Sequence, residues 1–154
     1  MLNIDMMNDN RVAQELIDEV DRQQKSDMLI PAGTWEGVLV SYQEREGQTD
    51  PTNKTYGHKV YTTNWQLYDV EGRTRTLNYV DVCPSMIKGQ DGRIDMRTVL
   101  AAQIAKAAGK GGAPITEAFD MLKVTRVKLK VTISKADESR KREPRNWVNA
   151  IYAV

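Results

Sequence analysis

Basic side chains gather in the C-terminal third of the sequence. Residues 123–145 hold nine basic and three acidic side chains, whereas residues 1–27 hold seven acidic and three basic ones. Contacts with phosphates need clustered Lys and Arg, so this stretch favours a polyanionic partner. The alternative interpretation is a solvated surface that keeps the protein soluble. The nine basic residues are Lys123, Arg126, Lys128, Lys130, Lys135, Arg140, Lys141, Arg142 and Arg145.

Two parts of this stretch are best suited to phosphate contacts. Lys128 and Lys130 alternate with apolar residues over 127–131, which predicts a strand with both lysines on its outer face. The second part is a basic loop over 135–145, whose alternative interpretation is the solvated tip of a hairpin. The loop bases with the strongest claim to phosphates are Arg140, Lys141, Arg142 and Arg145.

Aromatic rings could supply the other half of a single-strand site, because bases stack on exposed rings. Trp65 is expected in the core, since the opposite orientation of its strand would bury several polar side chains at a cost. Tyr68 then faces outward on the same strand. The rings to be sorted are Tyr42, Tyr56, Tyr61, Trp65, Tyr68, Tyr79 and Trp147.

Two further tyrosines are less constrained by the pattern. Tyr79 shares a strand face with Leu77 and Arg75 unless a bulge separates them, and it remains a candidate. Tyr56 lies in a polar loop with Lys54, His58 and Lys59 as neighbours. It is interpreted either as a stacking ring or as a loop residue folded over the end of a barrel.

Motifs for catalysis are poor by comparison. Gly109-Lys110-Gly111-Gly112 lacks the following Ser or Thr and the preceding strand of a phosphate loop. The single histidine has no recognisable nucleophile partner. Asp69, Glu71 and Asp81 could gather near one end of a hairpin and bind a metal ion, although such acids more often mark turns. We expect no catalytic residue, no metal and no cofactor.

Composition sets the class. The chain has 154 residues, 40% of them hydrophobic and 28% charged, which suits one folded domain with a core. No apolar run approaches the ~20 residues of a membrane span, and the start has neither the basic nor the apolar region of a secretory signal. One cysteine excludes an internal disulfide. The expected location is the reducing cytoplasm, that of the host cell if the protein is viral.

The pattern of elements predicts a mainly β domain. Strands are expected over 34–43, 59–70, 73–83, 126–133 and 146–154, by their β-formers, alternation and bounding turns. A helix over 96–108 has Asp95 as its N-cap and Gly109 as its C-cap, and residues 116–122 can add one or two helical turns. Residues 1–29 form an acidic arm, helical over 10–25, and the domain spans 30–154.

One helix between the third and fourth of five antiparallel strands is the layout of the OB-fold barrel. That barrel binds oligonucleotides over its second and third strands and over the loops after strands one and four. The longest loop, 45–57, and the most basic loop, 135–145, fall at these two places. The predicted fold is therefore a five-stranded antiparallel OB-fold barrel with a short N-terminal helical arm.

Four motifs of the sequence resemble those of bacteriophage single-stranded-DNA-binding proteins with an OB-fold. They are the opening Ile30-Pro31-Ala32-Gly33-Thr34-Trp35-Glu36-Gly37, the strand Trp65-Gln66-Leu67-Tyr68-Asp69 running into Gly72-Arg73, the helix 100–109 ending in glycine, and 127–133 followed by a charged loop and Asn146-Trp147-Val148. The resemblance covers residues 30–154. It implies a protein that coats single strands during phage replication or recombination, without catalysis.

The leading hypothesis is thus sequence-independent binding of single-stranded DNA. The alternative is an OB-like protein-interaction or assembly module of a phage, without a nucleic-acid function. The acidic arm could recruit phage or host replication proteins, and exposed strand edges would permit a homo-oligomer. The expected DNA-binding residues are Tyr56, Lys59, Tyr68, Arg75, Tyr79, Lys128, Lys130, Arg140, Lys141, Arg142 and Arg145.

Overall fold

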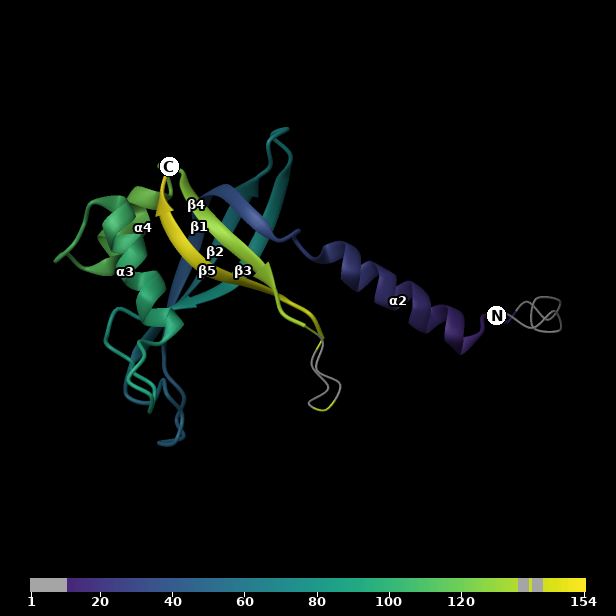
Figure 1. Ribbon diagram of the computed structural model, residues 1–154, viewed down its shortest axis with the longest axis horizontal. Helices are drawn as coiled ribbons and strands as arrows, with labels where there is room; N and C mark the ends of the chain where they lie inside the picture. Colours follow the sequence, from purple (N-terminus) through teal and green to yellow (C-terminus); the bar gives the residue numbers. More distant parts are fainter. Residues whose placement is uncertain (1–10, 136–138, 140–142) are drawn as a thin grey trace. The chain divides into compact units, whose positions relative to one another are not determined.

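The computed structural model describes residues 11–135, 139 and 143–154 (Figure 1). The chain divides into two compact units, Met1–Ile30 and Pro31–Val154. Among the residues described, no helix is long and apolar enough to cross a membrane. The predicted loop bases Arg140, Lys141 and Arg142 lie outside the described residues.

Among the described residues of the first unit, Gln14–Met28 form one helix, α2. It begins four residues later than predicted and ends three residues later. Its surface carries short-range polar pairs: Arg22 lies 2.7 Å from Glu19, and the Gln14 amide donates to Asp18 over 3.0 Å. Pairs of this spacing add a few tenths of a kcal/mol each to a helix.

The second unit is built on one antiparallel sheet of five strands. They are β1 (Gly33–Glu46), β2 (Lys59–Tyr68), β3 (Thr74–Val82), β4 (Val127–Ile133) and β5 (Asn146–Ala153), in the order β3-β2-β1-β4-β5. All five predicted strands are confirmed, with ends displaced by a few residues. The sheet is open, and β3 and β5 are its edges, so the closed barrel expected from the pattern is not what the hydrogen bonding forms.

Two helices, and not one, separate β3 from β4. α3 (Met96–Ala108) has the predicted bounds: the Asp95 side chain accepts the Arg97 N–H, and Gly109 ends the helix with φ 65°. α4 (Ile115–Leu122) is a separate helix of eight residues. Its buried face, Ile115, Ala118, Phe119 and Leu122, has helical spacing, and the helix confirms the one or two helical turns predicted over 116–122, starting one residue earlier.

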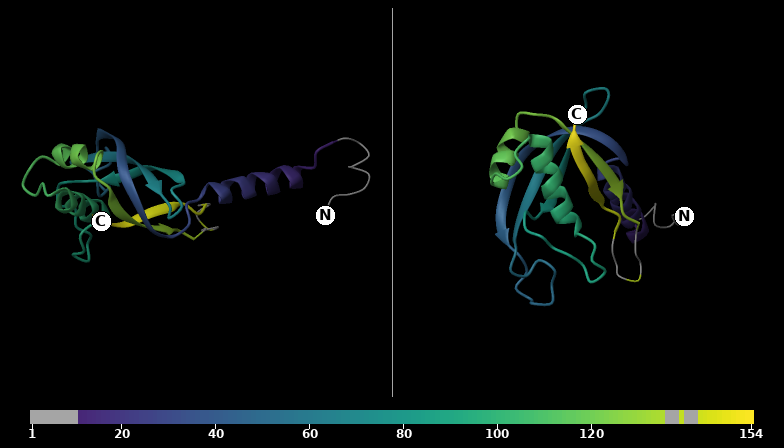
Figure 2. Two further views of the ribbon diagram at one scale, coloured as in Figure 1. Left: turned by 90° about the horizontal axis from the view of Figure 1, so that it is seen from above. Right: turned by 60° about the vertical axis from the view of Figure 1, so that its left-hand side comes forward.

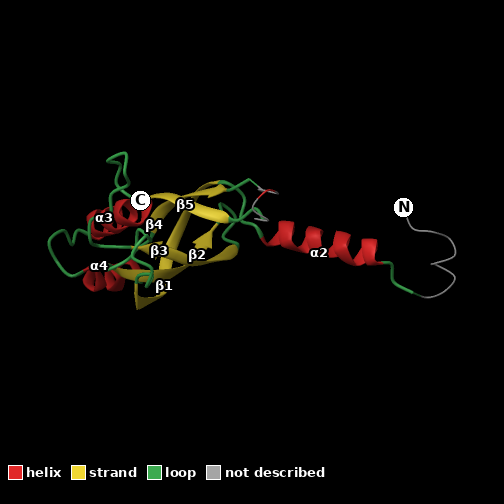
Figure 3. Ribbon diagram, turned by 90° about the horizontal axis from the view of Figure 1, so that it is seen from below, coloured by secondary structure: helices red, strands yellow, loops and turns green. Residues whose placement is uncertain are grey.

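α3 holds the two edges of the sheet together. The Cys83 N–H, just after β3, donates to the Arg97 carbonyl over 3.0 Å, and the Ile151 N–H of β5 donates to Gln103 Oε1 over 2.8 Å. The helix lies alongside β5 (Figure 2), and both α3 and α4 lie at the same end of the sheet (Figure 3). The two edges come close to each other beside this helix, because some Cα atoms of β3 and β5 lie within 8 Å.

The core fills the inner face of the sheet. Trp65 is fully buried, as predicted, and its Nε1 donates to Thr63 Oγ1, which in turn donates to the Val80 carbonyl. Gly37 marks a close approach of strands: a Cβ there would lie 2.7 Å from Leu67 Cδ2. The alternation over β4 is also confirmed, because Val127, Leu129 and Val131 are buried while the lysines between them are not.

Candidate nucleic-acid interface

A groove of about 560 Å³ lies between the two edges of the sheet. Its walls are the C-terminal half of β3, the start of β5 with the residue before it, and the first turn of α3. Lys54, from the loop between β1 and β2, completes it. The lining side chains that can stack or carry charge are Lys54, Tyr79, Asp81, Asp95, Arg97, Arg145 and Trp147.

Tyr79 is aimed into solvent by an irregularity in β3. The register between β2 and β3 shifts between Thr63 and Trp65, and Tyr79 sits in this bulge with φ 62°. Tyr79 is 81% exposed. A left-handed conformation at a non-glycine residue costs of order 1–3 kcal/mol. The bulge separates Tyr79 from the inward face of Leu77, which was the condition for its being a candidate.

Asn64 maintains that conformation from the neighbouring strand. Its Oδ1 accepts the Tyr79 N–H over 3.1 Å, and its Nδ2 donates to Ser41 Oγ over 3.0 Å. The two bonds fix the orientation of the Asn64 amide, because one needs the oxygen and the other the nitrogen. A relay from β1 through β2 therefore positions the exposed ring of β3.

Trp147 is the second ring of the groove. It is 45% exposed, and Val148 beside it is buried, so the indole stands on the outer side of β5. The Arg145 guanidinium lies over the indole, 4.1 Å from the ring centroid. Arginine over tryptophan is a favourable cation–π geometry, and the exposed part of Trp147 is accessible to a ligand.

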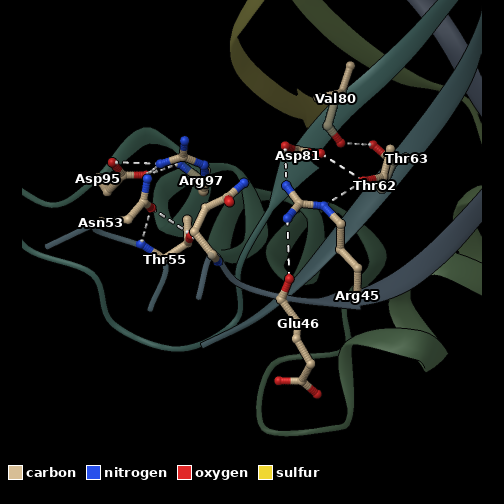
Figure 4. A network of polar contacts seen from close by, with 11 residues as sticks. Arg45, Glu46, Asn53, Thr55, Thr62, Thr63, Val80, Asp81, Asp95 and Arg97 are labelled. Atoms are coloured by element: carbon tan, nitrogen blue, oxygen red, sulfur yellow. Dashed lines mark hydrogen bonds and ion pairs between the residues drawn. The ribbon is translucent and has the colours of Figure 1, made fainter. Parts of the chain in front are cut away.

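The acids of the groove are paired within the protein (Figure 4). Asp81 accepts from Arg45 Nη2 over 2.8 Å and from Thr62 Oγ1 over 2.9 Å. Asp95 caps α3 and lies 3.1 Å from Arg97 Nη1. Lys54 has no ion pair with any residue that the structure describes. Lys54 and Arg145 therefore leave the groove with an excess of positive charge.

The loop that carries Lys54 is fixed by side-chain caps. Asp50 accepts the Thr52 N–H, which lowers the Asp50 pKa, and Asn53 accepts the Thr55 N–H over 3.0 Å. Thr55 is buried and accepts the Gln48 N–H. These Asx-type turns order a polar loop at little entropic cost on binding. Tyr56 is 52% exposed on this loop, outside the lining of the groove.

The other predicted residues lie elsewhere on the domain. Lys59 pairs with Glu44 over 3.4 Å, and this hydrogen bond raises the Lys59 pKa. Tyr68 lies at the far end of β2, under the Arg126 guanidinium. Arg75 is opposite Leu67 and therefore on the inward side, near the end of the sheet. Lys128 and Lys130 are on the outer face of β4. Of the predicted residues that the structure describes, only Tyr79 and Arg145 line the groove.

The acids Asp69, Glu71 and Asp81, which could have gathered to bind a metal ion, do not lie together. Asp69 closes the β2–β3 turn: although its partial burial raises its pKa, hydrogen bonds from the N–H and side chain of Arg73 and from the Glu71 N–H lower it overall. Asp81 is opposite Thr62, toward the other end of the hairpin. The pairing register separates these acids, because the hairpin is long.

Lys54, Arg97 and Trp147 are groove residues that the predicted set omitted. Trp147 was visible as an aromatic directly after the basic loop, two residues from Arg145. No sequence pattern indicated Arg97, because its position depends on how α3 packs against the edge strands β3 and β5. No family model matches the chain, and neither curated proteins nor solved structures gave a match.

Proposed function

We propose that this protein binds single-stranded DNA, without sequence preference, in the groove between β3 and β5. The observation that carries the proposal is the pairing of two exposed rings, Tyr79 and Trp147, with uncompensated positive charge from Lys54 and Arg145. Single strands are held by this combination of stacking platforms and basic side chains. No catalytic step is part of the proposal.

The arrangement of the sheet supports an OB-type fold as the scaffold. That fold is a partly open five-stranded barrel that binds oligonucleotides on strands two and three and on the loops after strands one and four. Here Tyr79 belongs to the third strand and Lys54 to the loop after the first. Arg145 ends the loop after the fourth strand. These three groove residues thus come from places that this fold uses, whereas Trp147 comes from β5 and Arg97 from α3.

The expected energetics follow from the two rings. Stacking on an aromatic side chain is worth ~1–3 kcal/mol per base by alanine substitution. At 1.4 kcal/mol per tenfold change, the loss of one ring weakens binding by roughly 5- to 150-fold. Coating of single strands in phage replication or recombination, the role implied by the resemblance of the sequence, needs no more than such stacking and charge.

The test is titration of a fluorescein-labelled oligo-dT of ~20 nucleotides, read by anisotropy at low salt, with Trp147→Leu beside the wild type. We expect Trp147→Leu to raise the Kd at least about fivefold. The matched control is Trp35→Phe, at a tryptophan outside the groove, which is expected to bind like the wild type. Equal Kd values for all three proteins would refute the groove as the site.

Absence of any binding would refute the function itself. In that case the exposed rings would be assigned to a protein partner, as in the interaction-module interpretation. A chemical-denaturation curve for each variant shows whether the compared proteins are folded.

A further inference from the structure

The outer face of β4 carries a row of basic side chains that leads away from the groove. Lys128 and Lys130 stand two residues apart, which places them ~6.7 Å apart along the strand. That spacing is comparable to the distance between phosphates in an extended single strand. Trp147 lies opposite Thr132, the next outward position on β4, so the row begins where the groove ends.

The far end of this row is also defined by strand register. Glu36 of β1 is opposite both Tyr68 on β2 and Lys128 on β4. Tyr68, Glu36 and Lys128 therefore form one cross-strand row on the outer face. Arg126 covers the Tyr68 ring, 4.1 Å from its centroid, and reaches Glu36 over 3.5 Å.

Each end of this face carries an arginine stacked over an aromatic ring. At one end Arg145 lies over Trp147, and at the other Arg126 lies over Tyr68. The lysines stand between these two stacks. The neighbours of Lys130 across the sheet, Thr34 and Ala150, are uncharged, and Glu36 is the acid next to Lys128.

We propose that this face is a second contact tract for the same DNA strand, which leaves the groove over Trp147 and crosses β4 toward Tyr68. The proposal rests on the proposed function and adds a length requirement to it. The ends of a short oligonucleotide stay in the groove. A longer strand gains phosphate contacts with Lys130 and Lys128, and a stacking position at the Tyr68–Arg126 pair.

The experiment compares two oligo-dT lengths, ~5 and ~20 nucleotides, on the wild type and on the double variant Lys128→Gln/Lys130→Gln. Each phosphate contact contributes ~0.7 to the slope of log K against log salt for single strands. The double variant should therefore lose about 1.4 from the slope with the long oligonucleotide, and bind it on the order of tenfold more weakly at 0.1 M salt. The short oligonucleotide should bind both proteins equally.

The matched control is Lys106→Gln, in the last turn of α3, at the opposite end of that helix from the groove. It removes one positive charge and is expected to leave the Kd of both lengths within about twofold of the wild type. An equal effect of the double variant on both lengths, or no effect on either, would overturn the second tract. Failure of the short oligonucleotide to bind the wild type at low salt would instead count against the groove, so the two proposals fail separately.

Discussion

Substitutions at Tyr79 are expected to affect the stability of the protein and its binding of DNA in different ways, because the backbone of this residue is strained. Its φ of 62° is freely adopted by Gly, tolerated by Asn and unfavourable for an aromatic or β-branched residue. Because Tyr79 is 81% exposed, its side chain contributes little packing energy to offset that conformation. We therefore expect Tyr79→Asn to be as stable as the wild type or up to about 2 kcal/mol more stable.

The same change removes one stacking platform from the groove. Tyr79→Asn should raise the Kd for oligo-dT about 5- to 150-fold, from ~1–3 kcal/mol of lost stacking. Tyr79→Val loses the ring as well and adds β-branched strain at a positive φ, so it should bind equally weakly and unfold more easily than Tyr79→Asn. Tyr79→Phe keeps the ring and should bind like the wild type.

Urea unfolding and anisotropy on the same four proteins measure the two quantities. The reasoning predicts that binding follows the presence of the ring, while stability follows the compatibility of the residue with φ 62°. It is refuted if Tyr79→Asn binds like the wild type, since the ring would then not contact DNA. A lower stability of Tyr79→Asn than of Tyr79→Val would refute the account of the backbone.

Three further predictions concern the supports of the groove and sheet. Gly37→Ala should destabilise the protein by about 1–3 kcal/mol in urea unfolding, because the added Cβ would lie within 3 Å of the Leu67 and Leu129 side chains. Gly111→Ala is the control: its Cβ would have open space around it, and the change should be neutral or slightly stabilising. Asn64→Leu removes the acceptor of the Tyr79 N–H and should weaken oligo-dT binding several-fold. The double variant Tyr79→Asn/Asn64→Leu should bind no more weakly than Tyr79→Asn alone, a non-additivity that a double-mutant cycle measures. Additive losses would argue against a positioning role for Asn64. The Asp69 pKa is lowered in the folded state, so the stability that the Asp69 carboxylate contributes is present above its unfolded-state pKa and lost as pH falls through its folded-state pKa. Asp69→Asn should therefore have a lower Tm than the wild type at neutral pH and the same Tm in strong acid. An equal Tm difference at both pH values would contradict this.

Much of the fold was predictable because local signals agreed with the tertiary structure. The α3 caps, the β4 alternation and the turn before β3 each follow from residue types at fixed spacings. Trp65 could be placed inside because the alternative orientation would have buried amides. The second helix between β3 and β4 was predicted as one or two helical turns, which matches its eight residues, although so short a periodic signal left its start one residue off.

The groove was harder to predict because it depends on distances between strands that are far apart in the sequence. Arg97 lines the groove with Trp147 because α3 is bonded to Cys83, just after β3, and to Ile151 of β5, and Lys54 reaches the groove from the loop between β1 and β2. Tyr79 depended on a bulge that alternation cannot place. Arg75 was expected to contact DNA, but the register at this end of β3 puts it on the inward face with Leu67.

The central claim is that the groove recognises single strands, and competition binding tests it most directly. Wild-type protein bound to labelled oligo-dT of ~20 nucleotides is challenged with unlabelled single-stranded and duplex DNA of equal length, over a range of salt. The account predicts displacement by the single strand at far lower concentration than by the duplex. At ~0.7 per phosphate contact, the slope of log K against log salt should be about −1.4 from Lys54 and Arg145 alone, and about −2.8 with Lys128 and Lys130 of the second tract. Equal competition by duplex DNA, or a slope near zero, would contradict it.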